Sequence, residues 1–298
     1  MNADVAIWLV GAGGMLGRQL AHEFAGRKFN FFASDREVDI CRRQELQEFA
    51  RGKNIGWIVN CAAYTAVDRA EGEPEQALAI NAEGVENLAR LAAELGARLI
   101  HFSSDYVFAG DGKEPYRENA QPRPLSRYGW SKWQGEIRLA ARLDTFFLMR
   151  ISWLYGVYGP NFVHAMLKIF QEQPAARVVN DQFGSPTYAS ALAENIARLI
   201  ESGSERYGVY HYCDSGAVSW FDFASRIMDL ALEFGMIPKR IPLEAVPTSA
   251  FPTAAVRPCY SVLDSGKAVR ELGFQVHDWQ FNLQKFFLEI KRLGGPRS

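Results

Sequence analysis

The sequence of 298 residues lacks the usual marks of a secreted, membrane-spanning or zinc-structured protein. Four cysteines lie far apart without a C-x-x-C pair, which argues against a zinc site or a thioredoxin-like motif. No apolar run approaches the roughly 18 to 20 residues that a membrane-crossing helix needs, so no membrane partner is expected. Residues 1–4 lack the basic n-region of a cleavable signal, and the apolar stretch after them runs directly into glycines. These absences predict a cytoplasmic location.

A strong charge of either sign is also absent. The chain has 33 Lys and Arg against 34 Asp and Glu, a formal net charge of −1, and no basic block of five or more. Because nucleic acids and anionic membranes reward a basic face, neither is an expected partner. A small-molecule substrate or a protein partner stays open, and the length allows one large α/β unit or two closely packed subdomains.

The first half of the chain alternates short apolar runs with segments of helical periodicity. The expected strands are residues 5–10, 29–34, 57–62, 98–104 and 145–152. The expected helices are residues 15–25, 43–51, 74–95 and 128–143. Uninterrupted apolar strands joined by helices predict an α/β fold, a Rossmann-type doubly wound parallel sheet covered on both faces.

The second half is less regular and predicts a smaller, interleaved substrate-binding subdomain. Residues 1–155 are the expected NAD(P)-binding Rossmann domain, with a return of the chain near 185–215, and residues 156–298 mainly bind substrate. The expected helices here are 189–202, 219–234 and 282–293, and the strand-like runs are 178–188 and 208–214. The Pro/Gly-rich loops at 109–126, 156–161 and 236–258 are interpreted as lids or substrate-side insertions.

A glycine-rich turn follows the first expected strand. Gly11, Gly14 and Gly17 have the spacing that lets a backbone approach a pyrophosphate at a helix N-terminus, although Leu16 breaks the strict G-x-G-x-x-G pattern. The alternative is a glycine turn without a ligand. The position of this turn after the first strand of a βαβ unit favours a dinucleotide site over that alternative.

Asp35 and Arg36 end the second expected strand, about 20 residues beyond the glycine turn. Asp35 can accept hydrogen bonds from the adenosine ribose of NAD, whereas Arg36 can pair with the 2′-phosphate of NADP. The cofactor is therefore expected to be NADPH or NADH, without a preference. A solvated turn pair is the alternative interpretation.

Tyr128 and Lys132 are four residues apart in a helical stretch, so one helix face carries both side chains. To exchange protons at neutral pH, a phenol must lose roughly 3 pKa units, about 4 kcal/mol. An ammonium about 4 Å away at an effective dielectric near 20 supplies that amount. The pair therefore predicts a phenol whose pKa is lowered by Lys132, although Tyr-x-x-x-Lys also occurs by chance on helix surfaces.

Ser103, Ser104 and Asp105 follow a buried strand and so lie at the edge where open α/β sheets bind ligands. The Ser104 hydroxyl can polarise a substrate carbonyl while Tyr128 delivers a proton to the developing alkoxide. Strand-end capping is the alternative role for both serines.

Together, the glycine spacing, the serine, the Tyr-x-x-x-Lys pair and the chain length resemble the extended short-chain dehydrogenase/reductases. Longer stretches resemble one branch of them, the dTDP-4-dehydrorhamnose reductase family. These stretches are NCAAYTAVDRAE (60–71), SSDYVFAGDGKEPYRE (103–118), RISWLYG (150–156), NFVHAMLK (161–168), NDQFGSPTY (180–188) and RPCYSVLD (257–264).

The resemblance implies an oxidoreductase of nucleotide-sugar and polysaccharide biosynthesis. Such an enzyme passes hydride from NAD(P)H to the C4 ketone of dTDP-4-dehydro-6-deoxy-L-mannose and forms dTDP-L-rhamnose. The resemblance also implies that Tyr128 donates the proton and that Ser104 replaces the usual threonine. Lys132 would tune the pKa of Tyr128 and bind the cofactor ribose. Asp105 and Trp153 match sugar-contacting positions. The matching dinucleotide-contacting positions are Gly14, Met15, Leu16, Asp35, Asp39, Ile40, Ala62, Ala63, Tyr64 and Thr65.

Other features of the resemblance leave questions open. Arg257 and Lys168 are weaker candidates for contacting the diphosphate. Some family members form a dimer around a magnesium ion held by glutamates, whereas the corresponding places here hold Gln19 and Ser190. No metal and no metal-bridged dimer is therefore expected, and the chain is expected to be a monomer or weak homodimer.

Two alternative functions remain open from the sequence. One is a reductase or epimerase of another 4-keto nucleotide sugar. The other is a non-catalytic protein that resembles the regulatory subunit of methionine adenosyltransferase; the indole of Trp153 favours the enzyme.

Overall fold

The computed structural model of the protein describes residues 5–295, and its centre is a six-stranded sheet. Every pairing in this sheet is parallel, and the strand order is β10-β5-β4-β3-β1-β2. The strands are β1 (Ala6–Val10), β2 (Phe31–Ser34), β3 (Ile55–Asn60), β4 (Arg98–Ser104), β5 (Phe146–Ile151) and β10 (Gly208–Tyr212). The predicted α/β fold with a doubly wound parallel sheet is confirmed.

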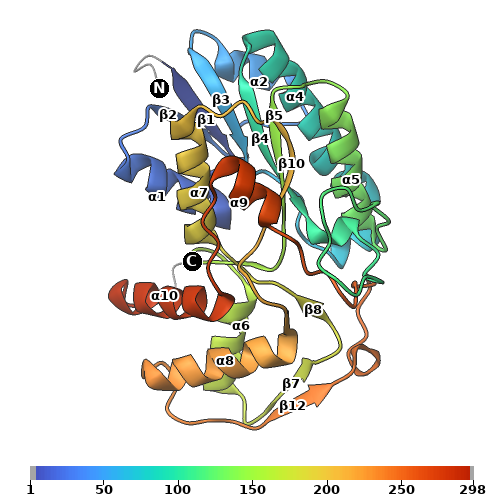
Figure 1. The fold of residues 1–298 in the computed structure, drawn as a ribbon, viewed down its shortest axis with the longest axis vertical. Coiled ribbons are helices and arrows are strands. Elements are labelled where there is room, and N and C mark those ends of the chain that lie inside the picture. Colours follow the sequence, from blue (N-terminus) through green and yellow to red (C-terminus); the bar gives the residue numbers. More distant parts are fainter. Residues whose placement is uncertain (1–4, 296–298) are drawn as a thin grey trace.

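Helices cover both faces of the sheet because its strands are apolar on both sides, as β1 with five buried residues illustrates. One face packs against α1 (Met15–Gly26), α7 (Ala189–Ser202) and α9 (Gly266–Leu272). The other packs against α2 (Arg43–Ala50), α4 (Gly84–Leu95) and α5 (Arg127–Ala140). Figure 1 shows these two groups of helices on opposite sides of the sheet.

The segment 74–95 is not the single helix that its sequence predicts. It is divided into α3 (Pro74–Leu78), a π-helix (Ala79–Glu83) and α4. Asn81 in the π-helix donates to the Tyr64 carbonyl and to Ser131 Oγ, and accepts from the Tyr64 N–H. Gly135 of α5 gives the π-helix room, since a Cβ there would lie 2.1 Å from the Asn81 carbonyl oxygen. Hydrophobic periodicity carries no signal for this wider turn.

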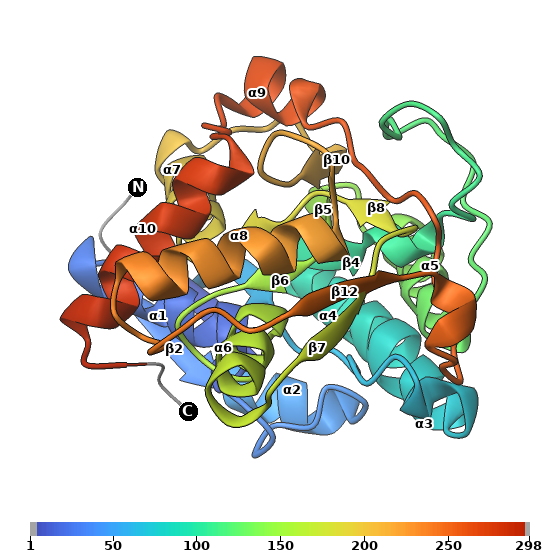
Figure 2. The same cartoon turned by 90° about the horizontal axis from the view of Figure 1, so that it is seen from below.

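The remaining elements form a second layer beyond the carboxyl ends of the sheet strands (Figures 1 and 2). Its helices α6 (Phe162–Glu172), α8 (Trp220–Glu233) and α10 (Trp279–Arg292) share one apolar core. The short strands pair as β7 (Ala176–Val179) with β12 (Leu243–Val246), β6 (Leu154–Tyr155) with β9 (Thr187–Tyr188), and β8 (Phe183–Gly184) with β11 (Val218–Ser219). Single 3-10 turns occur at Arg69–Glu71, Asp105–Val107 and Thr248–Ala250.

Two expectations for this half need correction. The segment 236–258 is not wholly loop, because β12 pairs in parallel with β7. The last helix begins at Trp279, before the expected residue 282, because Asp278 caps it by accepting from the Gln280 N–H at 2.8 Å. No helix within residues 5–295 is long and apolar enough to cross a membrane.

Candidate active site

All candidate ligand-binding loops meet at one edge, because six parallel strands direct their carboxyl ends the same way. The glycine turn follows β1, Asp35 follows β2, and Ala62–Thr65 follow β3. Asp105 follows β4, and Trp153 lies two residues after β5. The second layer of helices faces this edge (Figure 1).

The glycines of the turn have different roles. Gly11 has a φ of +74°, and a Cβ there would lie 2.5 Å from the Ala62 nitrogen. A Cβ on Gly17 would lie 2.2 Å from the Gly11 carbonyl oxygen, so the helix can approach the strand only without a side chain. Gly14 differs, because a Cβ there would meet nothing closer than that same oxygen at 3.5 Å. Packing therefore does not require glycine at this position.

The N-terminus of α1 directly follows Gly14 and suits an anion. Within residues 5–295, no side chain caps this helix, and its first turn contains no acidic residue. Its first N–H groups and the positive end of its dipole are therefore available to phosphate. Met15 and Leu16 begin the helix at this point. The residues fit a dinucleotide pyrophosphate.

Asp35 lies beside the glycine turn, where a Cβ on Gly13 would come within 2.4 Å of Asp35 Oδ2. The Asp35 carboxylate is exposed and can move aside, so this contact alone does not require glycine at position 13. Arg36 is exposed next to Asp35. Asp39 accepts from the Cys41 N–H at 2.9 Å, whereas Ile40 is only 5% exposed and packs against Gly84.

Buried amides organise the segment after β3. Asn60 Oδ1 accepts from the Ala62 N–H at 3.0 Å, and Asn81 bonds both backbone groups of Tyr64. These contacts fix the backbone of 62–65 beside the glycine turn, where Gly11 touches Ala62. Asn81 could not be identified from the sequence, because an isolated asparagine in a helical stretch carries no signal.

The structure brings Ser104, Tyr128 and Lys132 together. Tyr128 and Lys132 lie on α5, while Ser104 ends β4 with its hydroxyl close enough to the Tyr128 phenol to influence the pKa of that phenol. Ser104 also caps the following turn, accepting from the Tyr106 N–H at 3.1 Å. Lys132 is 2% exposed, and its Nζ donates to the Phe102 carbonyl at 2.6 Å. The capping role and the hydroxyl's position beside the phenol therefore coexist at Ser104.

The expected lowering of the Tyr128 pKa by Lys132 is wrong for this structure. Burial raises the pKa of Tyr128 to about 12, and the nearby Ser104 hydroxyl opposes part of the rise. Burial also lowers the pKa of Lys132 to about 8, against the opposing influence of Glu136. The sequence estimate omitted desolvation, which penalises both charged forms. Tyr128 is consequently a protonated phenol at neutral pH, the form that a proton donor requires.

Asp105 and Trp153 occupy the side of the site facing the second layer. Asp105 accepts from Ser104 Oγ at 2.9 Å, and burial raises the pKa of its carboxyl to about 6. Trp153 has a φ of +46°, a strained conformation for a bulky residue. Its ring stacks on Trp220 at 3.4 Å between centroids, and a Cβ on Gly184 would lie 2.4 Å from it. Packing therefore fixes this indole.

The two candidate diphosphate contacts differ. Arg257 pairs with Asp68, its Nη2 lying 2.7 Å from Oδ2 and its Nη1 3.1 Å from Oδ1. This ion pair holds the pKa of Asp68 below its ordinary value. Lys168 is exposed on α6. Arg257 thus joins the segment after β12 to the loop after β3.

Sequence reasoning missed a buried polar cluster behind the site. Glu136 accepts from Ser103 Oγ and from Arg150, whose Nη2 lies 2.6 Å from Oε2. Arg150 also reaches His211 Nε2 at 3.4 Å, and burial lowers the pKa of that imidazole to about 3. The signal that could have found Glu136 is its position four residues after Lys132, which repeats the spacing from Tyr128.

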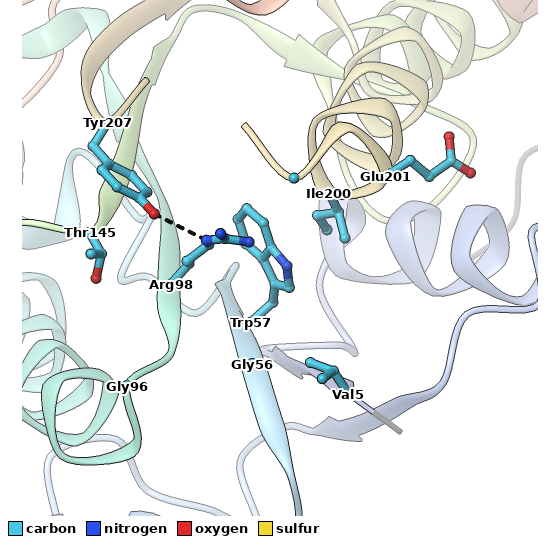
Figure 3. Close-up of a pocket in the computed structure, with 10 residues that line it drawn as sticks. Val5, Gly56, Trp57, Gly96, Arg98, Thr145, Ile200, Glu201 and Tyr207 are labelled. Carbon is cyan, nitrogen blue, oxygen red and sulfur yellow. Dashed lines mark hydrogen bonds between the residues drawn. The ribbon is translucent and has the colours of Figure 1, made fainter. Parts of the chain in front are cut away.

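A cavity at the opposite edge of the sheet is remote from this chemistry. It has a volume of about 390 Å³ and lies near the N-terminal ends of β3, β4 and β5 (Figure 3). Arg98 lies over the Trp57 ring at 5.1 Å, and its Nε donates to the Tyr207 hydroxyl.

Gln19 and Ser190 line another cavity, of about 480 Å³, with Glu194 and Glu289. Glu289 accepts a hydrogen bond from Tyr188. No group of three or more His, Cys, Asp or Glu side chains suited to a metal ion occurs within the described part of the chain.

Comparison with known proteins gives matches along almost the whole chain. Residues 5–292 match the family described as RmlD substrate binding domain. The dTDP-4-dehydrorhamnose reductase of Escherichia coli (strain K12) is 37% identical over 291 residues, covering 95% of this chain and 97% of that protein.

Solved structures agree with these matches. The dTDP-4-dehydrorhamnose reductase from Bacillus anthracis str. Ames, solved in complex with NADP, has a TM-score of 0.89 and 38% identity, covering 96% of this chain and 99% of that one. The structure of a dTDP-4-dehydrorhamnose reductase from Clostridium acetobutylicum ATCC 824 has a TM-score of 0.89 and 34% identity, covering 96% of this chain and 99% of that one.

Proposed function

Because the chain belongs to the dTDP-4-dehydrorhamnose reductase family, we propose that it is an NADPH-dependent oxidoreductase. It reduces the C4 ketone of dTDP-4-dehydro-6-deoxy-L-mannose to the alcohol of dTDP-L-rhamnose. The observation that carries this proposal is the meeting of Ser104, Tyr128 and Lys132 at the sheet edge, in a chain matching the family over residues 5–292.

The residues at the sheet edge suit a nicotinamide dinucleotide. The uncapped start of α1 and the open side of Gly14 would hold the pyrophosphate. Asp35 and Arg36 would meet the adenosine ribose, where the Arg36 guanidinium favours a 2′-phosphate. NADP in the Bacillus anthracis relative supports this preference. When bound, the cofactor supplies the hydride.

The protonated phenol of Tyr128 is suited to complete the reduction. Hydride addition turns the ketone oxygen into an alkoxide, a much stronger base than a phenolate, so proton transfer from Tyr128 is favourable even with its pKa raised to about 12. The Ser104 hydroxyl, which donates to Asp105 in this structure, would turn to donate to the same oxygen as charge develops there. Lys132, which lies on the same face of α5 as Tyr128 and whose Nζ donates to the Phe102 carbonyl, would bind the cofactor ribose.

The sugar would be bound between the sheet edge and the second layer. Asp105 would accept from a sugar hydroxyl, and the fixed indole of Trp153 would contact the apolar surface of the deoxysugar. The division into a dinucleotide-binding part (1–155, with the return at 185–215) and a substrate-binding part (156–298) belongs to this proposal. The proposal also includes that the protein acts without a metal-bridged dimer, because Gln19 and Ser190 stand where some family members have metal-binding glutamates.

The direct experiment incubates the protein with dTDP-4-dehydrorhamnose and either NADPH or NADH. Absorbance at the dihydronicotinamide band follows the rate, and chromatography identifies the sugar. Tyr128→Phe is the matched control, since it removes only the hydroxyl: we expect turnover to be abolished while NADPH binding is nearly unchanged. More than a tenth of the wild-type rate in this variant would contradict the role of Tyr128.

A further inference from the structure

The backbone of Trp153 has a conformation that its surroundings must impose. Its φ of +46° lies in the left-handed region, which a bulky residue rarely occupies. Within residues 5–295, Lys28, in the exposed turn after α1, is the only other residue besides glycines with a positive φ. Such a conformation persists where surrounding contacts over-determine it, and these places cluster at functional sites. The contacts that hold Trp153 are therefore candidates for a functional role.

Two segments of the second layer contact the Trp153 indole. Trp220, the first residue of α8, stacks on it with 3.4 Å between ring centroids and 7° between ring planes. Gly184 of β8 lies so close that a Cβ there would be 2.4 Å from Cε2 and 2.6 Å from Nε1 of the indole. Strand pairing joins the two contacts, because Gly184 lies opposite Val218 of β11, two residues before Trp220. We call residues 183–184 and 218–220 the clip.

Further contacts hold the clip and Trp153 together. Ser152 Oγ, one residue before Trp153, donates to the Ser185 carbonyl, one residue after the clip's glycine, at 2.5 Å. Phe162 of α6 packs against Trp220 with 4.4 Å between ring centroids. The indole is therefore held through the backbone on one side and through the aromatic core of the second layer on the other.

The indole explains why β8 contains a glycine. Gly184 is buried, and its φ is not positive, so its backbone conformation suits other residues too. The three atoms nearest to a Cβ at this position all belong to Trp153. Alanine at position 184 would therefore have to displace the indole, and that displacement would disturb its stack on Trp220.

We propose that Gly184 and Trp220 are positioning residues that hold the Trp153 indole at the angle at which a deoxysugar binds. This role rests on the proposed function, in which the indole contacts the apolar surface of the sugar. The clip belongs to the second layer, whereas the glycine turn and Asp35 follow β1 and β2. The clip therefore acts on binding of the nucleotide sugar and not on binding of the dinucleotide.

The position of the indole can be followed by ¹⁹F NMR in the full chain labelled with 5-fluorotryptophan, without cofactor or substrate. Trp153→Phe assigns the resonance by its disappearance. We expect Gly184→Ala to shift this resonance, because the added methyl group moves the indole relative to the Trp220 ring. Gly26→Ala is the matched control, since a Cβ there would meet no atom within 4 Å and the resonance should stay in place. An unchanged Trp153 resonance in Gly184→Ala would overturn the proposal.

The reductase assay tests the effect on the sugar. Both Gly184→Ala and Trp220→Leu should raise the KM for the nucleotide sugar about fivefold, with a smaller change in kcat and an unchanged Kd for NADPH. Trp220→Phe keeps an aromatic ring in the stack and should restore most of the lost affinity. Should Gly184→Ala fail to fold, the comparison of Trp220→Leu with Trp220→Phe decides the same point.

Two different failures can be told apart. If the wild-type protein reduces the nucleotide sugar but the KM is unchanged in Gly184→Ala and Trp220→Leu, the clip has no positioning role and this proposal is overturned. If the wild-type protein reduces no nucleotide sugar, the proposed function fails, whereas the ¹⁹F resonance still decides whether Gly184 and Trp220 hold the indole.

Discussion

Replacing Lys132 by methionine should stabilise the folded protein while removing its activity. The pKa of Lys132 falls from its ordinary value of 10.5 to about 8, because burial disfavours the ammonium. That difference corresponds to about 3 kcal/mol of unfavourable free energy in the folded state. Loss of the hydrogen bond to the Phe102 carbonyl offsets about 1 kcal/mol of the stability gained when this penalty is removed. We therefore expect Lys132→Met to raise the free energy of unfolding by about 2 kcal/mol at pH 7.

The pH dependence of this stabilisation has a definite sign. Below about pH 8, Lys132 is charged in both the folded and the unfolded chain, so the wild-type protein bears the whole penalty. Between pH 8 and 10.5 the unfolded chain binds more protons at this site, so wild-type stability rises with pH. The advantage of the variant is therefore largest below pH 8 and declines toward pH 10.5.

Urea unfolding at pH 7 and at pH 9.5 measures both effects. Lys239→Met is the control, because Lys239 is exposed and its replacement should change the free energy of unfolding by less than about 0.5 kcal/mol. The reasoning is refuted if Lys132→Met is no more stable than wild type at pH 7, or if its advantage is the same at both pH values.

Three further predictions concern the cofactor, the sugar and assembly. Trp220→Leu removes the stacking partner of Trp153, worth about 1 kcal/mol, so the KM for the nucleotide sugar should rise about fivefold with the NADPH Kd unchanged; equal changes in both constants would contradict this. Arg36→Ala should lower the ratio of kcat/KM for NADPH to kcat/KM for NADH about tenfold, because a charged hydrogen bond to the 2′-phosphate is lost. An unaltered ratio would show that Arg36 does not contact the 2′-phosphate. Magnesium titration followed by analytical ultracentrifugation should leave the sedimentation coefficient unchanged, and magnesium-driven dimer formation would show that Gln19 and Ser190 do not prevent it.

The parallel sheet was predictable because its strands are apolar on both faces and alternate with amphipathic helices. Helix α7 begins and ends at the residues that periodicity predicts. The interrupted helix at 79–83 was not predictable, because its cause is a tertiary contact: Asn81 bonds Tyr64 and Ser131, and Gly135 makes space. Strand β12 was hidden for a similar reason, since its only partner in the described chain is the distant β7.

Motif spacing predicts which candidate residues lie together, but not the protonation state of each. Spacing places Tyr128 and Lys132 on one helix face, and the strand end places Ser104 near them. The pKa of each group depends on how deeply it is buried, which sequence spacing does not reveal. The ion pair between Arg257 and Asp68, 189 residues apart, is likewise visible only in three dimensions.

Because all strands of the central sheet run the same way, the candidate active site lies at one edge of the sheet, and the turns at the opposite edge can be changed without touching it. Insertions, fluorescent labels or surface tethers attached to the turns at Gly52 and Gly96, which precede β3 and β4, lie at the opposite edge from Tyr128. A Cβ at either turn would meet no atom within 4 Å. A small molecule captured by the cavity around Trp57 and Arg98 would not compete for space with the dinucleotide or the sugar. Any inhibition by such a molecule would have to be transmitted through the strands themselves.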